Sequence, residues 1–218
     1  YSVPRNALMA QISASVLAAD FLALGSELGA VETADRLHLD VMDGHFVPNI
    51  SFGPSVIEAV QRRSSNPLDV HLMATDPASH VQRLVDLDVE SITVHAEATD
   101  CLPALAARIR DAGIDPGVAI NPETDVAAVE SALSDFSRVV VMGVVPGFTG
   151  RDFVPTVLEK IEQLAERGGV TVEVDGGIDE RWAARSADAG AEIVVSGSTI
   201  FGSDDRAATI EALRMAGT

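Results

Sequence analysis

HLDVMDGHFVPN, at residues 38–49, is the stretch from which both the fold and the site of this chain can be predicted. Polar and apolar residues alternate at its start, which is typical of a β-strand with His38, Asp40 and Met42 on one face. Asp43-Gly44 then ends the strand, and Pro48-Asn49 favours an irregular loop. An imidazole and a carboxylate two positions apart on one strand face can hold a metal ion, although a half-buried strand with a solvated polar face shows the same pattern.

Two later stretches share this pattern. DVHLM, at residues 69–73, places His71 and Met73 on one strand face, and VEVDGG, at residues 172–177, places Asp175 at the end of an apolar run. Three separate strands therefore each carry a metal-capable residue close to a following loop. Chance explains one such strand more easily than three, so the pattern favours a shared site.

The composition limits the classes of protein to consider. With 218 residues the chain suits one sizeable domain, and 47% hydrophobic against 4% aromatic residues predicts an aliphatic core. A formal net charge of -18 argues against nucleic acid and anionic membranes as partners, and it requires any phosphate site to be built locally. No apolar run approaches the ~20 residues of a membrane-spanning helix. Cys101 is the only cysteine, which fits a reducing cytoplasm.

Short β-branched runs alternate with helical patterns from Gln11 onward. The predicted strands lie near residues 11–17, 36–42, 68–73, 89–95, 115–120, 137–143, 170–175 and 191–196, and the predicted helices near 20–33, 53–63, 77–87, 101–112, 123–134, 153–167, 179–189 and after 203. Helix starts are indicated by Asp76-Pro77 and Asp152, and helix ends by Gly113 and Gly168-Gly169.

This alternation predicts a single (β/α)8 TIM barrel over residues 10–218, with a doubly wound open sheet as the alternative. Residues 1–9 are predicted to be an N-terminal extension or a leader. In such a barrel the active site lies at the carboxyl ends of the strands, so His38, Asp40, His71 and Asp175 can converge there.

Glycines follow the last three predicted strands, at 147 and 150, at 176 and 177, and at 197. Loops at these places of a barrel often bind phosphate through backbone N–H groups, and glycine allows the backbone to approach closely. Singly, each glycine is more typical of an ordinary turn. Jointly they predict a phosphate site.

With these residues in view, the chain resembles the ribulose-phosphate 3-epimerase family from about residue 12 to residue 201. The resemblance is carried by SASVLAADF (13–21), HLDVMDGHFVPN (38–49), LDVHLM (68–73), VHAE (94–97), PGFTG (146–150), VEVDGGI (172–178) and SGSTIF (196–201). It implies a TIM barrel of the ribulose-phosphate-binding type, a sugar-phosphate substrate and a cytoplasmic homo-oligomer, either a dimer or a hexamer.

The resemblance also implies roles for individual residues. His38, Asp40, His71 and Asp175 match four metal ligands, and Asp40 and Asp175 match the acid/base pair. The matches to substrate-contacting residues are Ser15, Met42, His71, Met73, Met142, Gly147, Phe148, Thr149, Gly150, Gly176, Gly177, Gly197 and Ser198. Two imidazoles and two carboxylates suit one divalent ion, Zn first, with Fe(II), Mn or Co as alternatives.

Some residues depart from the family pattern. Ala14 replaces a proline, and the turn before His38 is about two residues short. In the loop after the sixth predicted strand, Gly143 and Val145 replace hydroxyl or polar residues, and Thr149 replaces a glycine. These changes leave the preferred sugar phosphate open.

Epimerisation next to a carbonyl removes a proton from one face of a carbon and returns one to the other face, which two opposed carboxylates can do. The first hypothesis is a 3-epimerase that interconverts D-ribulose 5-phosphate and D-xylulose 5-phosphate. Its alternatives are a 3-epimerase for a ketohexose 6-phosphate such as D-allulose 6-phosphate, and a non-catalytic phosphosugar-binding barrel. His95 and Glu97 are candidates for a place behind the metal ligands or for ordinary core residues.

Overall fold

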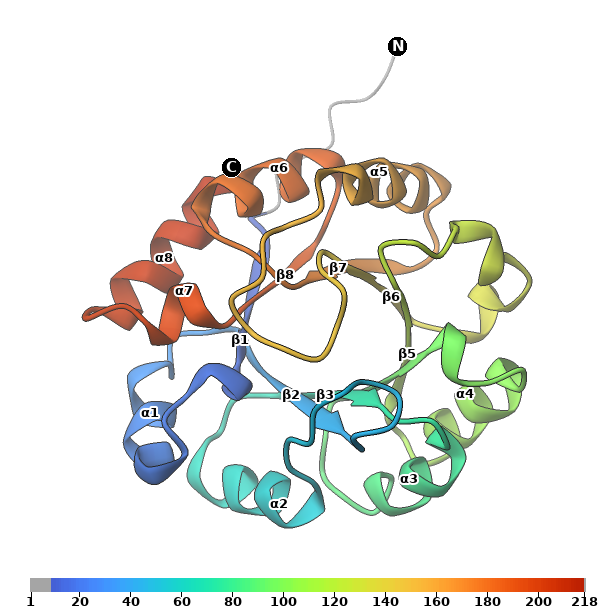
Figure 1. Ribbon diagram of the computed structural model, residues 1–218, viewed down its shortest axis with the longest axis horizontal. Coiled ribbons are helices and arrows are strands. Elements are labelled where there is room, and N and C mark those ends of the chain that lie inside the picture. Colours follow the sequence, from blue (N-terminus) through green and yellow to red (C-terminus); the bar gives the residue numbers. More distant parts are fainter. Residues whose placement is uncertain (1–8, 218) are drawn as a thin grey trace.

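The computed structural model describes residues 9–217, so residues 1–8 of the predicted N-terminal extension lie outside the described residues. Eight parallel strands close into a barrel in chain order, and β8 pairs with β1 (Figure 1). The strands are β1 (Gln11–Ser15), β2 (Arg36–Met42), β3 (Leu68–Met73), β4 (Ser91–His95), β5 (Asp115–Ile120), β6 (Arg138–Met142), β7 (Thr171–Asp175) and β8 (Ile193–Ser196). The predicted (β/α)8 barrel is confirmed, and the open sheet is excluded.

Helices surround the barrel in Figure 1. They are α1 (Leu24–Ala30), α2 (Pro54–Arg63), α3 (Pro77–Leu84), α4 (Leu102–Asp111), α5 (Leu158–Arg167), α6 (Glu180–Ala189), α7 (Ser198–Phe201) and α8 (Arg206–Ala216). The side chain of Asp76 caps α3 by accepting from the backbone N–H of Ser79. Helix α5 is followed by its C-cap Gly168, whose φ of 68° favours glycine. Within residues 9–217 no helix is long and apolar enough to span a membrane.

One helix prediction was wrong in type. The segment predicted as a helix at residues 123–134 forms two short 3₁₀ helices, η4 (Val126–Ala128) and η5 (Glu130–Asp135). The Asp125 side chain accepts a hydrogen bond from the backbone N–H of Ala127, a local contact that favours tight turns over a continuous α-helix. The predicted start at Asp152 was also wrong, because α5 begins at Leu158 after a 3₁₀ turn at Pro155–Val157.

The strands bury both of their faces, and the two faces differ in character. Leu37, Leu39, Val70 and Leu72 belong to the large aliphatic core that also contains buried residues of the surrounding helices. The alternate positions of the same strands carry His38, Asp40, Asp69 and His71, all buried. Since neighbouring side chains of a strand point to opposite faces, these polar groups line the barrel interior.

A layer of buried charge fills part of that interior. Arg138 on β6 places Nη1 3.1 Å from Asp69 Oδ1 and 3.0 Å from Glu173 Oε2, and all three side chains are almost fully buried. Burial raises the pKa of Asp69, but the Arg138 guanidinium together with the hydrogen bond and charge of His38 outweighs this and holds the pKa well below the usual range. Burial together with the nearby Asp69 carboxylate raises the pKa of Glu173 to about 8. One cation is thus shared by two interior carboxyl groups.

We expect Arg138→Met to destabilise the fold by about 3–5 kcal/mol, because it removes the charge that compensates a buried carboxylate. Arg167→Met is the matched control, since Arg167 pairs with Glu130 at the surface, where such pairs contribute about 0–1 kcal/mol. Urea denaturation of both variants gives the free energies of unfolding. An equal, small loss in both variants would contradict the proposed importance of the buried layer.

Candidate metal centre and active site

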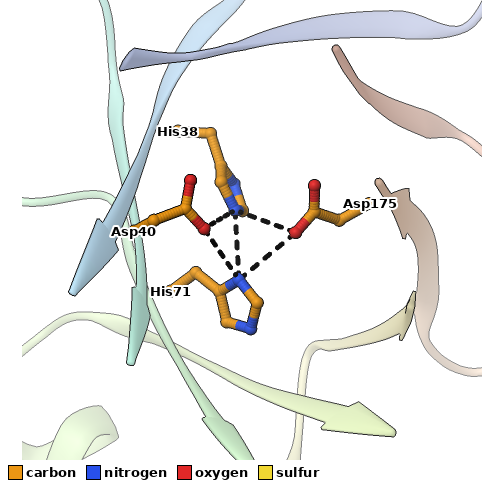
Figure 2. Close-up of side chains that lie close together, drawn as sticks. All are labelled: His38, Asp40, His71 and Asp175. Carbon is orange, nitrogen blue, oxygen red and sulfur yellow. Dashed lines mark hydrogen bonds and ion pairs between the residues drawn. The ribbon is translucent and has the colours of Figure 1, made fainter. Parts of the chain in front are cut away.

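Four of the predicted residues meet at the carboxyl ends of β2, β3 and β7. Figure 2 shows Asp40 and Asp175 facing one another across the rings of His38 and His71. His38 Nε2 lies 3.5 Å from Asp40 Oδ1 and 3.5 Å from Asp175 Oδ2. His71 Nδ1 lies 3.2 Å from Asp40 Oδ1 and 3.3 Å from Asp175 Oδ2, and the two histidine nitrogens are 3.3 Å apart.

These spacings fit one metal ion. Four ligands held about 2.0–2.1 Å from a tetrahedral zinc ion are about 3.3–3.4 Å from one another. Five of the separations between the four atoms are 3.2–3.5 Å, and all four atoms lie within 4.8 Å of one another. Two nitrogens and two carboxylate oxygens also form a donor set that suits divalent ions of the zinc and iron type. The buried cluster can therefore hold a metal ion.

The electrostatics of the cluster favour a cation at its centre. Burial lowers the pKa of His71, but hydrogen bonds and charges of Asp175 and Asp40 raise it to about 9. The same carboxylates outweigh burial at His38 and raise its pKa well above the usual value. Burial opposes ionisation of Asp40, yet His38 and His71 hold its pKa far below the usual range. Positive charge between the carboxylates is favourable whether protons or a metal supply it.

Asp40 uses its two oxygens for different contacts. Oδ1 faces the two imidazoles, whereas Oδ2 accepts a hydrogen bond of 2.8 Å from the Ser15 hydroxyl at the end of β1. Asp175 reaches the imidazoles through Oδ2 and keeps a side-chain exposure of 12%. Both carboxylates can therefore contact the imidazoles of the buried cluster and face the space above it at the same time.

His38 is backed by a carboxylate of the buried charge layer. Its Nδ1 lies 2.8 Å from Asp69 Oδ2, so this nitrogen donates to Asp69 and leaves Nε2 as the metal-facing atom. His38, Asp69 and Glu173 are also close enough to form a second candidate cluster. We assign no metal to it, because Arg138 already supplies a cation to both carboxyl groups.

His71 has a different partner behind it. Its Nε2 lies 2.9 Å from Nε2 of His95, and His95 Nδ1 lies 3.1 Å from Glu97 Oε2. Burial lowers the pKa of His95 to about 4, so this histidine is neutral. Hydrogen bonds from His95 and Thr124 outweigh partial burial and lower the pKa of Glu97 to about 2. His95 thus lies directly behind His71, and Glu97 lies behind His95.

A cavity opens above the cluster at the barrel mouth. The residues that line it include Asp40 and Asp175 together with Ser15, Met42, Met73, Met142, Gly147, Phe148, Thr149, Gly150, Gly176, Gly177, Gly197 and Ser198. His38 and His71 are fully buried. Within residues 9–217 the lining contains no lysine or arginine, and Arg151 instead lies over the ring of Phe148.

The loop after β6 crosses the barrel mouth in Figure 1. It is tied to the loop after β2, because the Asn49 side-chain amide donates to the Gly147 carbonyl at 2.8 Å. Gly143 begins this loop, and a Cβ there would lie 2.4 Å from the Gly176 carbonyl oxygen and 2.7 Å from the Phe153 ring. Gly143 departs from the family pattern, and packing explains this glycine because a side chain there would clash with Gly176 and Phe153.

Asp69, Arg138 and Glu173 were not predicted as functional residues from the sequence. A signal existed for two of them, because Asp69 shares a strand face with His71, and Glu173 shares one with Asp175. Arg138 begins β6, where a charged residue is typical of a solvated strand end, and nothing in the sequence indicates its burial. Their mutual pairing depends on the closure of the barrel.

Known proteins resemble this chain over most of its length. A profile described as the ribulose-phosphate 3 epimerase family matches residues 11–201. The ribulose-phosphate 3-epimerase of Bacillus subtilis is 40% identical over 94% of this chain and 99% of its own length. That of Mycobacterium bovis is 41% identical over 93% of this chain and 91% of its own length.

Solved structures with low identity support the fold alone. A 3-hexulose-6-phosphate synthase has a TM-score of 0.72 at 19% identity and covers 94% of this chain and 99% of its own. KGPDC from Streptococcus mutans in complex with D-R5P has a TM-score of 0.72 at 13% identity, with 96% and 98% covered. Profile, identity and coverage together show that the chain belongs to the ribulose-phosphate 3-epimerase family and is an isomerase.

Proposed function

We propose that the protein is a metal-dependent epimerase that interconverts D-ribulose 5-phosphate and D-xylulose 5-phosphate at C3 by two-base proton transfer through an enediolate. The family supports a pentose-phosphate epimerase, and the site supports the mechanism. The homo-oligomer, a dimer or a hexamer, stays a prediction from the resemblance.

The single observation that carries this proposal is the pair of opposed carboxylates. Asp40 on β2 and Asp175 on β7 lie on opposite sides of the two imidazoles, and both line the same cavity (Figure 2). A substrate carbon between them presents one face to each carboxyl group. A protein that only binds phosphosugars has no need of such a pair, so the geometry favours catalysis over binding alone.

The proton transfer balances with these two residues. One carboxylate is ionised and removes the C3 proton from one face, and the resulting enediolate keeps the electron pair of the broken C–H bond. The other carboxyl group is protonated and donates its proton to the opposite face of C3, which gives the epimer. The reverse reaction exchanges the roles of Asp40 and Asp175. Ser15 holds Asp40 Oδ2 in place during this exchange.

A divalent metal held by His38, Asp40, His71 and Asp175, Zn first with Fe(II), Mn or Co as alternatives, would stabilise the negative charge of the enediolate as a Lewis acid. The methionines Met42, Met73 and Met142 line the cavity beside the acid/base pair. Their apolar side chains exclude water and offer no competing proton donor to the reacting carbon.

The phosphate end of the substrate is proposed to bind at the glycine segments that follow β6, β7 and β8. These segments border the same cavity as Asp175, and no cationic side chain among residues 9–217 lines it. The phosphate oxygens would therefore accept hydrogen bonds mainly from backbone N–H groups. Gly177 shows the close packing of this region: its φ is 71°, and a Cβ there would lie 2.8 Å from the Phe153 backbone nitrogen.

The first test is an epimerisation assay of the metal-loaded protein on both sugar phosphates. We expect kcat/KM for D-ribulose 5-phosphate to exceed that for D-allulose 6-phosphate by about 10- to 200-fold, the discrimination typical of one added carbon unit. An equal or higher value for the hexose would favour the alternative epimerase, for which Thr149 on the cavity wall is the departure to consider. Inactivity on both would contradict the proposal.

The second test concerns the metal. Elemental analysis of protein reloaded after chelation should find about one divalent ion per chain, and His71→Ala should lower this content sharply because it removes one of four ligands. His45→Ala is the matched control, since His45 is exposed in the loop after β2. Metal content that is unchanged in His71→Ala would contradict the site.

The third test separates the two bases. Asp40→Asn and Asp175→Asn keep the size of the side chain and one oxygen but remove the proton carrier, so epimerisation should fall by about 10²–10⁴-fold in each. In deuterated water, the base that each variant retains should exchange the C3 proton of one epimer only, and the two variants should differ in which epimer. Metal content is measured in parallel. Wild-type epimerisation in either variant with metal present would contradict the two-carboxylate assignment.

A further inference from the structure

We infer that His95 and Glu97 are positioning residues that fix the tautomer and orientation of His71, and thereby set the affinity of the site for its metal. The inference rests on the proposed function, because it presupposes a metal ion at His71 Nδ1. Neither residue lines the cavity in which the reacting atoms are proposed to lie. They act only through His71.

The hydrogen bonds allow one arrangement of protons. His71 Nδ1 faces the two carboxylates and must carry a lone pair to bind a metal, so the ring proton of neutral His71 is on Nε2. That proton points to His95 Nε2, 2.9 Å away, which must then accept. A neutral His95 that accepts at Nε2 carries its own proton on Nδ1, where Glu97 Oε2 lies 3.1 Å away as an acceptor. Each donor and each acceptor in this series of hydrogen bonds from His71 to Glu97 therefore has a complementary partner.

Neighbouring residues hold His95 and Glu97 in place. His95 ends β4, is fully buried, and lies with its ring plane 22° from that of His71. Phe46 covers it with a ring centroid distance of 4.7 Å. Glu97 is fixed by its other oxygen, Oε1, which accepts from the Asn121 backbone N–H at 2.8 Å and from the Thr124 hydroxyl. The series of hydrogen bonds from His71 through His95 and Glu97 therefore ends at the segment after β5.

That segment has a support of its own. Lys160 on α5 donates from Nζ to the carbonyl of Asn121 at 3.1 Å and to that of Pro122 at 2.7 Å. The orientation of His71 thus depends, through His95 and Glu97, on contacts with the outer layer of the barrel. His38 differs, because its carboxylate partner Asp69 contacts it directly. Partners of this kind raise the basicity of a ligand, and their loss typically costs about 10–100-fold in metal affinity.

The experiment measures metal binding rather than turnover. Co²⁺ is titrated into metal-free protein against a competing chelator, and its visible absorption reports the coordination. His95→Phe removes the acceptor while keeping a planar ring, and we expect the affinity to fall by about 10–100-fold. His95→Gln can place an amide oxygen near the lost nitrogen and should recover most of the affinity. His80→Phe is the matched control, because His80 on α3 contacts the Asp76 carbonyl instead.

Glu97→Gln supplies a milder variant should His95→Phe fail to fold. It keeps the shape and one acceptor oxygen but removes the charge, so we expect a weaker loss of about 3- to 10-fold, below the full range for a lost partner. In zinc-loaded wild-type protein labelled with ¹⁵N-histidine, long-range ¹H–¹⁵N spectra should show His95 protonated on Nδ1 and His71 on Nε2. His95 protonated on Nε2 would overturn the inference.

The outcomes separate this inference from the proposed function. Wild-type protein that binds no Co²⁺ would contradict the proposed metal dependence and the inference with it. Wild-type binding that is retained in full by His95→Phe and Glu97→Gln would leave the function standing and overturn the inference alone. Equal losses in His95→Phe and His95→Gln would also overturn it, because packing rather than the hydrogen bond would then be responsible.

Discussion

The pairing of buried carboxylates with cations along the barrel interior is the constraint on which the rest of this structure depends. Asp69 and Glu173 share the guanidinium of Arg138, whereas Asp40 and Asp175 share two imidazoles at the mouth. An unpaired buried carboxylate costs several kcal/mol, so each layer needs its positive partner in the folded state. The cation beside Asp69 and Glu173 is a fixed guanidinium. At the mouth the positive charge between Asp40 and Asp175 can be supplied by protons or by a metal, which are exchangeable, and the proposed chemistry depends on this difference.

The fold was predictable because short β-branched runs alternate with helical patterns along the chain, even where a strand such as β6 is apolar throughout its interior. The predicted bounds of 36–42 and 68–73 match β2 and β3, where polar and apolar positions alternate most clearly. The segment at 123–134 was not predictable in type, since its apolar spacing suits an α-helix and only the local contact at Asp125 favours 3₁₀ turns. The clustering of these four residues was predictable because each lies within a few residues of the carboxyl end of a strand, where the side chains of a closed barrel converge.

The sequence does not indicate which side chains pair with one another across the barrel interior. Asp69 and Arg138 are far apart in the chain, and each looks like an ordinary strand residue until β3 and β6 are placed in one closed sheet. The role of His95 was open for the same reason, because a buried histidine and a ligand-supporting histidine have the same sequence pattern. Only the 2.9 Å contact with His71 distinguishes the two interpretations.

The acidity of the chain also bears on how it would bind an anionic sugar phosphate. With a formal net charge of -18 and no cationic side chain among residues 9–217 lining the cavity, long-range attraction contributes nothing to affinity. In the proposed site, a metal would offset the carboxylates near the reacting carbon, and backbone donors would hold the phosphate. Gly176 and Gly177 directly follow Asp175, so in the proposed site one turn of the chain would fix the distance between the acid/base group and the phosphate. In the proposed site, sugar length would therefore be selected by backbone geometry rather than by charge.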